Sequence, residues 1–276
     1  MATNNQGSKA ARDAAAKARA DAKAAQKARD RKVTLIGIGA VVAIVAVLAV
    51  VGIISVNKQN TAKNGPLPKG VTSDTFGVKV GTAWKAANAD SIPKLQLWED
   101  FQCPACYEME ASSGSTVLKL AQEGKLRLEW RPTIFLDQNL AQLNTKYQHP
   151  NSSLTATMAL GCAVDAGVEE KFHPAVFARQ HNQFNTLEPK EEGYGFGLEE
   201  LMSAATQAGL SGDALNTFQT CLTAEKYKNW VNASYNQFNS SGVTSTPTGF
   251  LNGKELDQKV LFDPKALTEA ISAAAK

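Results

Sequence analysis

Two of the four cysteines are three residues apart, in the segment Cys103-Pro-Ala-Cys106. On a helix this spacing puts both thiols on the same face, close enough to close a disulfide. Pro104 is tolerated in the first turn of a helix, so Cys103 is predicted to lie at an exposed helix N-terminus. Unpaired N–H groups and the positive end of the helix dipole favour a thiolate there, which is the form that attacks disulfides. We therefore predict thiol–disulfide exchange, with Cys103 attacking and the less exposed Cys106 resolving.

A Cys-x-x-Cys pair has two other common uses, as half of a zinc site or as a structural disulfide. A zinc site needs two more ligands, usually a second closely spaced Cys or His pair. The three histidines are scattered, and the other two cysteines lie far apart: His149, His173, His181, Cys162 and Cys221. We favour redox chemistry and expect no metal ion and no cofactor.

The motif follows a predicted strand and begins a predicted helix. Leu95 and Leu97 alternate at strand spacing and Trp98 follows, so part of residues 94–100 is expected to be buried in a sheet. Trp98 and Phe101 are predicted core residues. The helix that begins at the motif is expected to run to about residue 122, because Gly124 is a typical stop signal.

Asp100-Phe-Gln-Cys-Pro-Ala-Cys106 after a strand resembles the active site of the thioredoxin superfamily, and most closely of its DsbA-like branch. Downstream, Thr244-Ser-Thr246-Pro247-Thr-Gly-Phe-Leu251 resembles that family's cis-proline loop and the strand after it. With the closing helix, the likeness covers about the last two thirds of the chain. It implies an α/β thioredoxin-like fold with an inserted helical domain.

The resemblance assigns substrate binding to Thr246 and Pro247. Only about 5–6% of X–Pro bonds in folded proteins are cis, so the pattern alone favours trans, whereas the family implies cis. The backbone of Thr246 is then expected to pair with an extended substrate strand. Threonine departs from the valine common in DsbA oxidases and also occurs in isomerases, which leaves the direction of the reaction open.

Glu99 and Asp100 directly precede the motif, and the resemblance makes one of them a candidate proton relay to Cys106. The alternative is that both are solvated residues at the end of a strand. Ala105 stands where the most oxidising DsbA proteins have a histidine, and it has no side-chain donor for the thiolate. We therefore expect a redox potential less oxidising than theirs.

Residues 139–241 are predicted to form the inserted domain, which packs beside the active site in DsbA-like proteins. Its two cysteines, Cys162 and Cys221, are expected to form a structural disulfide rather than a second redox pair, which suits an exported protein. Helical patterns occur at residues 153–166, 169–180, 198–208, 213–222 and 226–238.

Strands and a closing helix are predicted on both sides of the insertion. Residues 76–80 form a first strand, and residues 126–136 alternate like a strand that Pro132 interrupts or places near an edge. A hairpin is expected around Asn252-Gly253, and Asp263 begins the last helix as its N-cap.

The first part of the chain predicts a membrane anchor. Residues 1–32 hold nine basic and three acidic side chains, so this leader carries +6 and the rest of the chain −3. Residues 33–56 contain no charge and are long enough to cross about 30 Å of hydrocarbon as one transmembrane helix. An uncleaved signal anchor with a cytoplasmic N-terminus is expected. Residues 57–75 are a polar tether, and residues 76–276 form the catalytic domain outside the cytoplasm.

These features predict a single-pass protein of the cell membrane that introduces disulfides into exported proteins with free thiols. A membrane partner is expected to reoxidise it, and nucleic acid is not expected as a partner because the basic charge is confined to the leader. The organisation resembles DsbA-like proteins of Gram-positive bacteria with an unusual envelope. The alternatives are a reductase or isomerase, for example in cytochrome c maturation, and a non-catalytic thioredoxin-like binding module.

Overall fold

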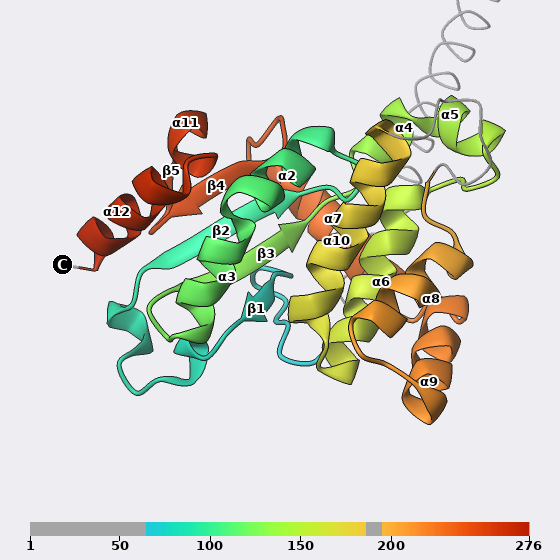
Figure 1. The fold of residues 1–276 in the computed structure, drawn as a ribbon, viewed down its shortest axis with the longest axis horizontal. Coiled ribbons are helices and arrows are strands. Elements are labelled where there is room, and N and C mark those ends of the chain that lie inside the picture. The colour runs from blue at the N-terminus through green and yellow to red at the C-terminus, as the bar shows by residue number, and fades with distance from the viewer. Residues whose placement is uncertain (1–64, 186–194, 276) are drawn as a thin grey trace, which may run out of the picture. The chain divides into compact units, whose positions relative to one another are not determined.

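The computed structural model describes residues 65–185 and 195–275 (Figure 1). The predicted leader, the predicted transmembrane segment at residues 33–56 and residues 57–64 of the predicted tether lie outside this range. Among the described residues, no helix is both long and apolar enough to span a bilayer.

A mixed five-stranded sheet lies at the centre of the domain, in the order β1-β3-β2-β4-β5. Only β2 and β3 pair in parallel, and the other neighbours are antiparallel. Because β2 lies in the middle of the sheet, the motif that follows it is held on a rigid element. The strands are β1 (Val78–Val80), β2 (Lys94–Glu99), β3 (Arg127–Pro132), β4 (Thr248–Leu251) and β5 (Lys254–Glu255).

Of the two alternatives for Pro132, the structure shows the interruption: the strand predicted at residues 126–136 ends at Pro132, and β3 is the second strand of the sheet, next to the edge strand β1. Pro132 is the last residue of β3, opposite Glu99 in the register, where a missing N–H ends the ladder. The predicted hairpin is present between β4 and β5. Asn252 and Gly253 both have positive φ, at 50° and 83°, as a type I′ turn requires.

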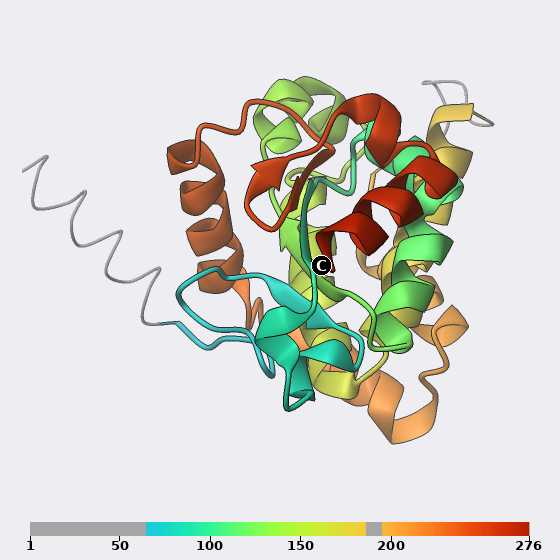
Figure 2. The same cartoon turned by 90° about the vertical axis from the view of Figure 1, so that its left-hand side faces the viewer.

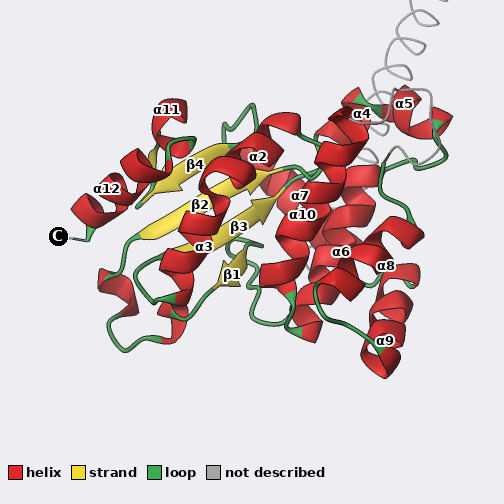
Figure 3. Cartoon of the chain, viewed as in Figure 1, coloured by secondary structure: helices red, strands yellow, loops and turns green. Residues whose placement is uncertain are grey.

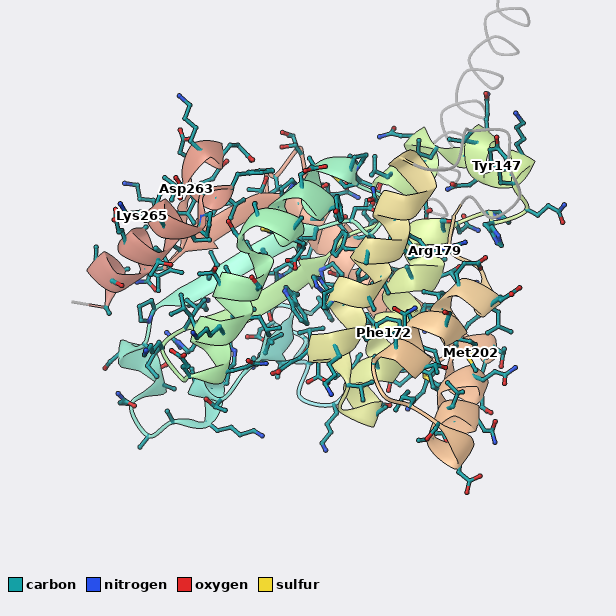
Figure 4. All side chains as sticks on the ribbon, viewed as in Figure 1. Tyr147, Phe172, Arg179, Met202, Asp263 and Lys265 are labelled. Atoms are coloured by element: carbon teal, nitrogen blue, oxygen red, sulfur yellow. A yellow bond between two sulfur atoms is a disulfide. The ribbon has the colours of Figure 1, made fainter. Side chains whose placement is uncertain are left out.

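The sheet has helices on both faces (Figure 2). The motif helix is a continuous helical segment made of α2 (Pro104–Met109), a π-helical turn η3 (Glu110–Gly114) and α3 (Ser115–Gln122). It lies on the same face as α12 (Pro264–Ala274), whereas α10 (Lys228–Ser240) covers the opposite face. Asp263 caps α12 by accepting hydrogen bonds from the backbone N–H groups of Lys265 and Ala266, near the left of Figure 4.

The insertion between β3 and β4 is entirely helical where it is described (Figure 3). All five predicted helices are present within a few residues, and two short helices, α4 and α5, precede them. Phe172 of α7, which is labelled in Figure 4, packs against Phe218 of α9 with ring centroids 5.5 Å apart. Besides α10, the helices are α4 (Leu136–Asn139), α5 (Ala141–Lys146), α6 (Ser152–Ala166), α7 (Glu169–Asn185), α8 (Leu198–Gln207) and α9 (Gly212–Thr223); α11 (Gln258–Leu261) follows the hairpin.

The end of the predicted tether packs on the domain instead of extending away from it. The backbone N–H of Lys69 donates to the carboxylate of Asp165 on α6, at 3.1 Å. Val71 is buried, and the indole of Trp230 donates to the carbonyl of Phe76. Lys69 and Val71, in the second half of the predicted tether, thus belong to the packed part of the chain.

Candidate active site

Cys103 is the N-cap residue of α2, and Pro104 occupies the first helical position. The strand β2 ends four residues earlier, so the chain passes from the sheet into the helix within one short turn. The prediction that Cys103 is exposed is wrong, since only 6% of its surface is accessible. Cys106 is completely buried, as expected for the resolving thiol, and both cysteines are free thiols in this structure.

The peptide bond between Thr246 and Pro247 is cis, and it lies directly against the motif. The thiol of Cys103 donates a hydrogen bond to the carbonyl of Thr246, with 3.3 Å between Sγ and O. The loop before β4 and the motif helix, separated by more than half of the domain's length, thus meet at the attacking sulfur. An extended peptide that bonds to the backbone of Thr246 would lie next to Cys103.

The two thiols have opposite acidities. A hydrogen bond from Cys106 is the main influence on Cys103, and with further hydrogen bonds from Thr246 and from backbone N–H groups it outweighs burial and lowers the pKa of Cys103 to about 6. Burial raises the pKa of Cys106 far above its usual value, and the charges of Cys103 and Glu99 raise it further. At neutral pH the reduced site therefore holds one thiolate and one thiol, as sequential attack and resolution require.

Glu99 is the last residue of β2 and is 4% exposed. The alternative of a solvated residue at the strand end is therefore wrong. Burial raises the pKa of Glu99 to about 8. Within the described part of the chain, neither carboxylate oxygen accepts a hydrogen bond. Glu99 holds its proton at neutral pH and its charge raises the pKa of Cys106, so it is the candidate acid for exchanging a proton with that thiol.

Asp100 is also fully buried, so it is not solvated either. Its carboxylate accepts hydrogen bonds from the backbone of Gln102 and Leu136 and from the hydroxyl of Ser153. Burial raises its pKa to about 7. The carboxylate of Asp100 thus hydrogen-bonds to the turn before Cys103 and to the helical insertion. Glu99 is the acid whose charge acts on Cys106.

A family model described as Thioredoxin matches residues 86–273, which includes the motif, the cis-proline loop and the whole insertion. The chain belongs to this thioredoxin family. The prediction of a DsbA-like thioredoxin relative is confirmed.

Three solved structures show what this thioredoxin-family chain is similar to. MdbA, a thiol-disulfide oxidoreductase from Actinomyces oris, is 24% identical with a TM-score of 0.63, over 77% of this chain and 94% of its own. The oxidised DsbA of Mycobacterium tuberculosis is 26% identical with a TM-score of 0.55, over 72% and 92%. The reduced DsbG of the same organism is 26% identical with a TM-score of 0.54, over 72% and 86%. A comparison with curated proteins finds no match.

In this thioredoxin-family chain, two polar residues that the sequence did not point to lie beside Glu99. His173 of α7 stacks on Trp130, with ring centroids 3.8 Å apart, and Glu110 lies in the π-helical turn η3. One ligand atom from each of Glu99, Glu110 and His173 lies within 4.8 Å of the others. No local pattern marks these residues, because each one comes from a different element.

Cys162 and Cys221 form a disulfide between α6 and α9, with the two Cα atoms 6.0 Å apart. Cys162 is buried, and both residues lie in the helical insertion rather than in the motif helix. This is the arrangement expected of a structural link within the insertion.

Proposed function

We propose that this protein is a membrane-anchored thiol:disulfide oxidoreductase that introduces disulfides into exported proteins. One observation carries the chemistry. The sulfur of Cys103 is at the N-terminus of α2 and 3.3 Å from the Thr246 carbonyl, with the buried thiol of Cys106 beside it. An attacking sulfur, a resolving sulfur and a backbone group for the substrate meet at one point.

The reaction starts from the Cys103–Cys106 disulfide. A substrate thiolate attacks Sγ of Cys103, and the electron pair of the broken bond goes to Cys106, which takes up a proton. A second substrate thiolate then attacks the substrate sulfur of the mixed disulfide, and Cys103 leaves as a thiolate. The low pKa of Cys103 makes it a good leaving group and stabilises the reduced protein, which favours oxidation of the substrate.

Two further observations support oxidation of exported proteins as the direction of the reaction: the activity of the relatives and the backbone group at Thr246. The Actinomyces oris relative is a thiol-disulfide oxidoreductase, and a DsbA is among the similar structures. The predicted backbone pairing at Thr246 suits extended segments of many sequences, as exported substrates require. A membrane reoxidase of unidentified kind is expected to restore the disulfide.

The redox potential of Cys103/Cys106 tests the direction. The full chain in detergent would be equilibrated with glutathione buffers, its thiols trapped by alkylation, and the motif peptide quantified by mass spectrometry. A potential of about −120 to −180 mV, the range of DsbA and protein disulfide isomerase, supports oxidation. A potential near −270 mV, as in thioredoxin, would replace the proposal with a reductase.

The location is a separate part of the proposal and rests on the uncharged apolar segment at residues 33–56 behind a basic leader. Protease added to intact cells should digest the catalytic domain and spare an epitope placed at the N-terminus. Protection of the catalytic domain until the cells are lysed would contradict this orientation.

A further inference from the structure

Glu99, Glu110 and His173 form a polar cluster in an otherwise apolar part of the core. Glu99 is 4% and His173 2% exposed, whereas the side chain of Glu110 keeps 11% of its surface accessible. The charge of Glu99 raises the pKa of Cys106, so the buried end of the cluster acts on that thiol, and the other end reaches solvent at Glu110.

The imidazole of His173 lies between the two carboxyl groups. Its Nε2 is 3.4 Å from Glu99 Oε2, and its Nδ1 is 3.8 Å from Glu110 Oε2. Burial lowers the pKa of His173 to about 4, so the ring is neutral at pH 7. A neutral imidazole has one N–H donor and one acceptor nitrogen, and it can take a proton on one side while releasing one on the other.

The carboxyl groups of Glu99 and Glu110 hold protons at neutral pH. One oxygen of each carboxyl group lies within 4.8 Å of one oxygen of the other, so a charge on one disfavours ionisation of the other. Burial raises the pKa of each to about 8, and the charge of Glu99 acts on Glu110 in the same direction. The cluster thus holds protons at neutral pH, and its charge acts on Cys106, which must take up a proton when its disulfide is broken.

The backbone near Glu110 is built to bring its carboxylate to the cluster. Glu110 begins the π-helical turn η3, an element often found at functional sites. Gly114 has no side chain where the Glu110 carboxylate lies, and a Cβ at position 114 would collide with Glu110 Oε2. The motif helix therefore departs from regular α-geometry at the point where Glu110 turns inward.

We propose that Glu99, His173 and Glu110 form a chain that carries protons between Cys106 and solvent. This inference rests on the proposed function. When a substrate thiolate attacks Cys103, the Cys103–Cys106 bond breaks and its electron pair goes to the sulfur of Cys106. That sulfur takes a proton from Glu99, which regains one from Glu110 through His173, and water resupplies Glu110.

In the reverse reaction the same protons move outward. The titratable groups that face Glu99 are Cys103 and Cys106 on the motif helix, Glu110 on η3 and His173 on α7. Glu110 and His173 act through Glu99 and are therefore positioning residues for it.

A divalent metal ion is the competing occupant, and the geometry favours protons. One ligand atom of each residue lies within 4.8 Å of the others, but an imidazole binds an ion through one nitrogen, and the two carboxyl groups lie nearest to different nitrogens, at 3.4 and 3.8 Å. A cavity of about 10 Å³ adjoins Glu99 and His173 and offers no further ligand, because its other walls are apolar: Phe101, Trp130, Pro132, Leu160 and Phe177.

Reaction with dithiobisnitrobenzoate resolves the reactions of Cys103 and Cys106 as two successive kinetic phases. With the reduced full chain, attack by Cys103 releases a first coloured thiolate. Cys106 must then lose its proton to attack Sγ of Cys103, which releases the second. We expect Glu110→Gln to slow the second phase about tenfold or more and to leave the first unchanged. Glu108→Gln, on the exposed face of the same helix, is the matched control and should change neither phase.

Three further variants separate proton transfer from a structural effect. His173→Phe keeps the aromatic stacking on Trp130 but removes both nitrogens, and it should slow the second phase as Glu110→Gln does. Gly114→Ala keeps every acid but displaces the Glu110 carboxylate, with the same expected result. In Glu110→Ala, added acetate should restore the second phase by replacing the missing carboxyl group.

The outcomes are distinguishable. An absent first phase in the wild type would refute the proposed function itself. A normal first phase with an unchanged second phase in Glu110→Gln and His173→Phe would overturn only the proton chain, as would failure of acetate to restore Glu110→Ala. Stoichiometric zinc bound by the wild type from a zinc solution, and not by Glu110→Gln, would replace the chain with a metal site.

Discussion

Ser153, in the first turn of α6, donates a hydrogen bond of 2.6 Å to the carboxylate of Asp100, three residues before Cys103. The side chain of Gln102 forms two hydrogen bonds with Asn144 of α5, at 2.8 and 3.1 Å. The backbone N–H of Cys103 in turn donates to the carbonyl of Asp100. The helical insertion therefore holds the turn that carries the motif.

This coupling predicts that Ser153→Ala destabilises the protein by about 1–3 kcal/mol, because it removes a hydrogen-bond donor from a buried carboxylate. Denaturant unfolding of the oxidised protein measures the change. Ser203→Ala, at an exposed position of α8, is the control and should stay within about 0.5 kcal/mol of the wild type. Equal stabilities of the two variants would mean that the contact does not hold the turn.

The pH dependence of alkylation tests the acidity of Cys103. Its pKa is about 6, so the rate of reaction of the reduced protein with iodoacetamide should reach half its maximum near pH 6. Cys106→Ala removes the main stabilising hydrogen bond and should move the midpoint to higher pH. A wild-type midpoint near the ordinary thiol value would contradict the arrangement of the site.

Thr246→Val should also raise the pH midpoint of Cys103 alkylation, but by less than Cys106→Ala does. The Thr246 side chain helps to lower the pKa of Cys103, and its buried hydroxyl has no hydrogen-bond partner among the described residues. Valine keeps the shape and removes only the hydroxyl. Thr244→Val changes an exposed residue of the same loop and should leave the midpoint unchanged. If both variants shift it equally, the hydroxyl is not the cause.

The buried acids predict a loss of stability with rising pH. Glu99 and Glu110 have a pKa of about 8 in the folded protein against an ordinary 4.5, so the folded state keeps protons that the unfolded chain has lost. The stability they contribute is complete below about pH 4.5 and disappears as pH rises through about 8. Free energies of unfolding of the oxidised protein should therefore fall between these values.

Glu99→Gln should make this decline shallower without abolishing it, because Asp100, with a pKa of about 7, still contributes. Denaturant titrations at a series of pH values measure the slope, and Glu108→Gln should keep the wild-type slope. An unaltered slope in Glu99→Gln would show that its proton is not retained on folding.

The disulfide between Cys162 and Cys221 closes a loop with a sequence separation of 59. Replacing both cysteines by alanine should lower the free energy of unfolding by about 3–5 kcal/mol on the chain-entropy model. The potential of Cys103/Cys106 should not change, because the two pairs lie on different elements. A shifted potential in this variant would mean that the second disulfide takes part in redox exchange.

Local sequence was sufficient for the motif and for most elements. Cys103, Pro104 and Cys106 are neighbours, so one helix start defines their relative positions and the acidity expected of the first thiol. The five helices of the insertion were predictable because helical patterns and the turn residues between them act over a few positions. The fold class followed from resemblance, and the family match at residues 86–273 supports it.

Tertiary packing decided the rest. Glu99 and Asp100 are adjacent in sequence and differ in role because the charge of Glu99 acts on Cys106, whereas the carboxylate of Asp100 accepts a hydrogen bond from Ser153 across the domain. His173 and Glu110 meet Glu99 only when α7 packs against the motif helix, and no spacing along the chain encodes that contact. Burial, which sets the acidity of these groups, belongs to the folded core and not to any segment of the sequence.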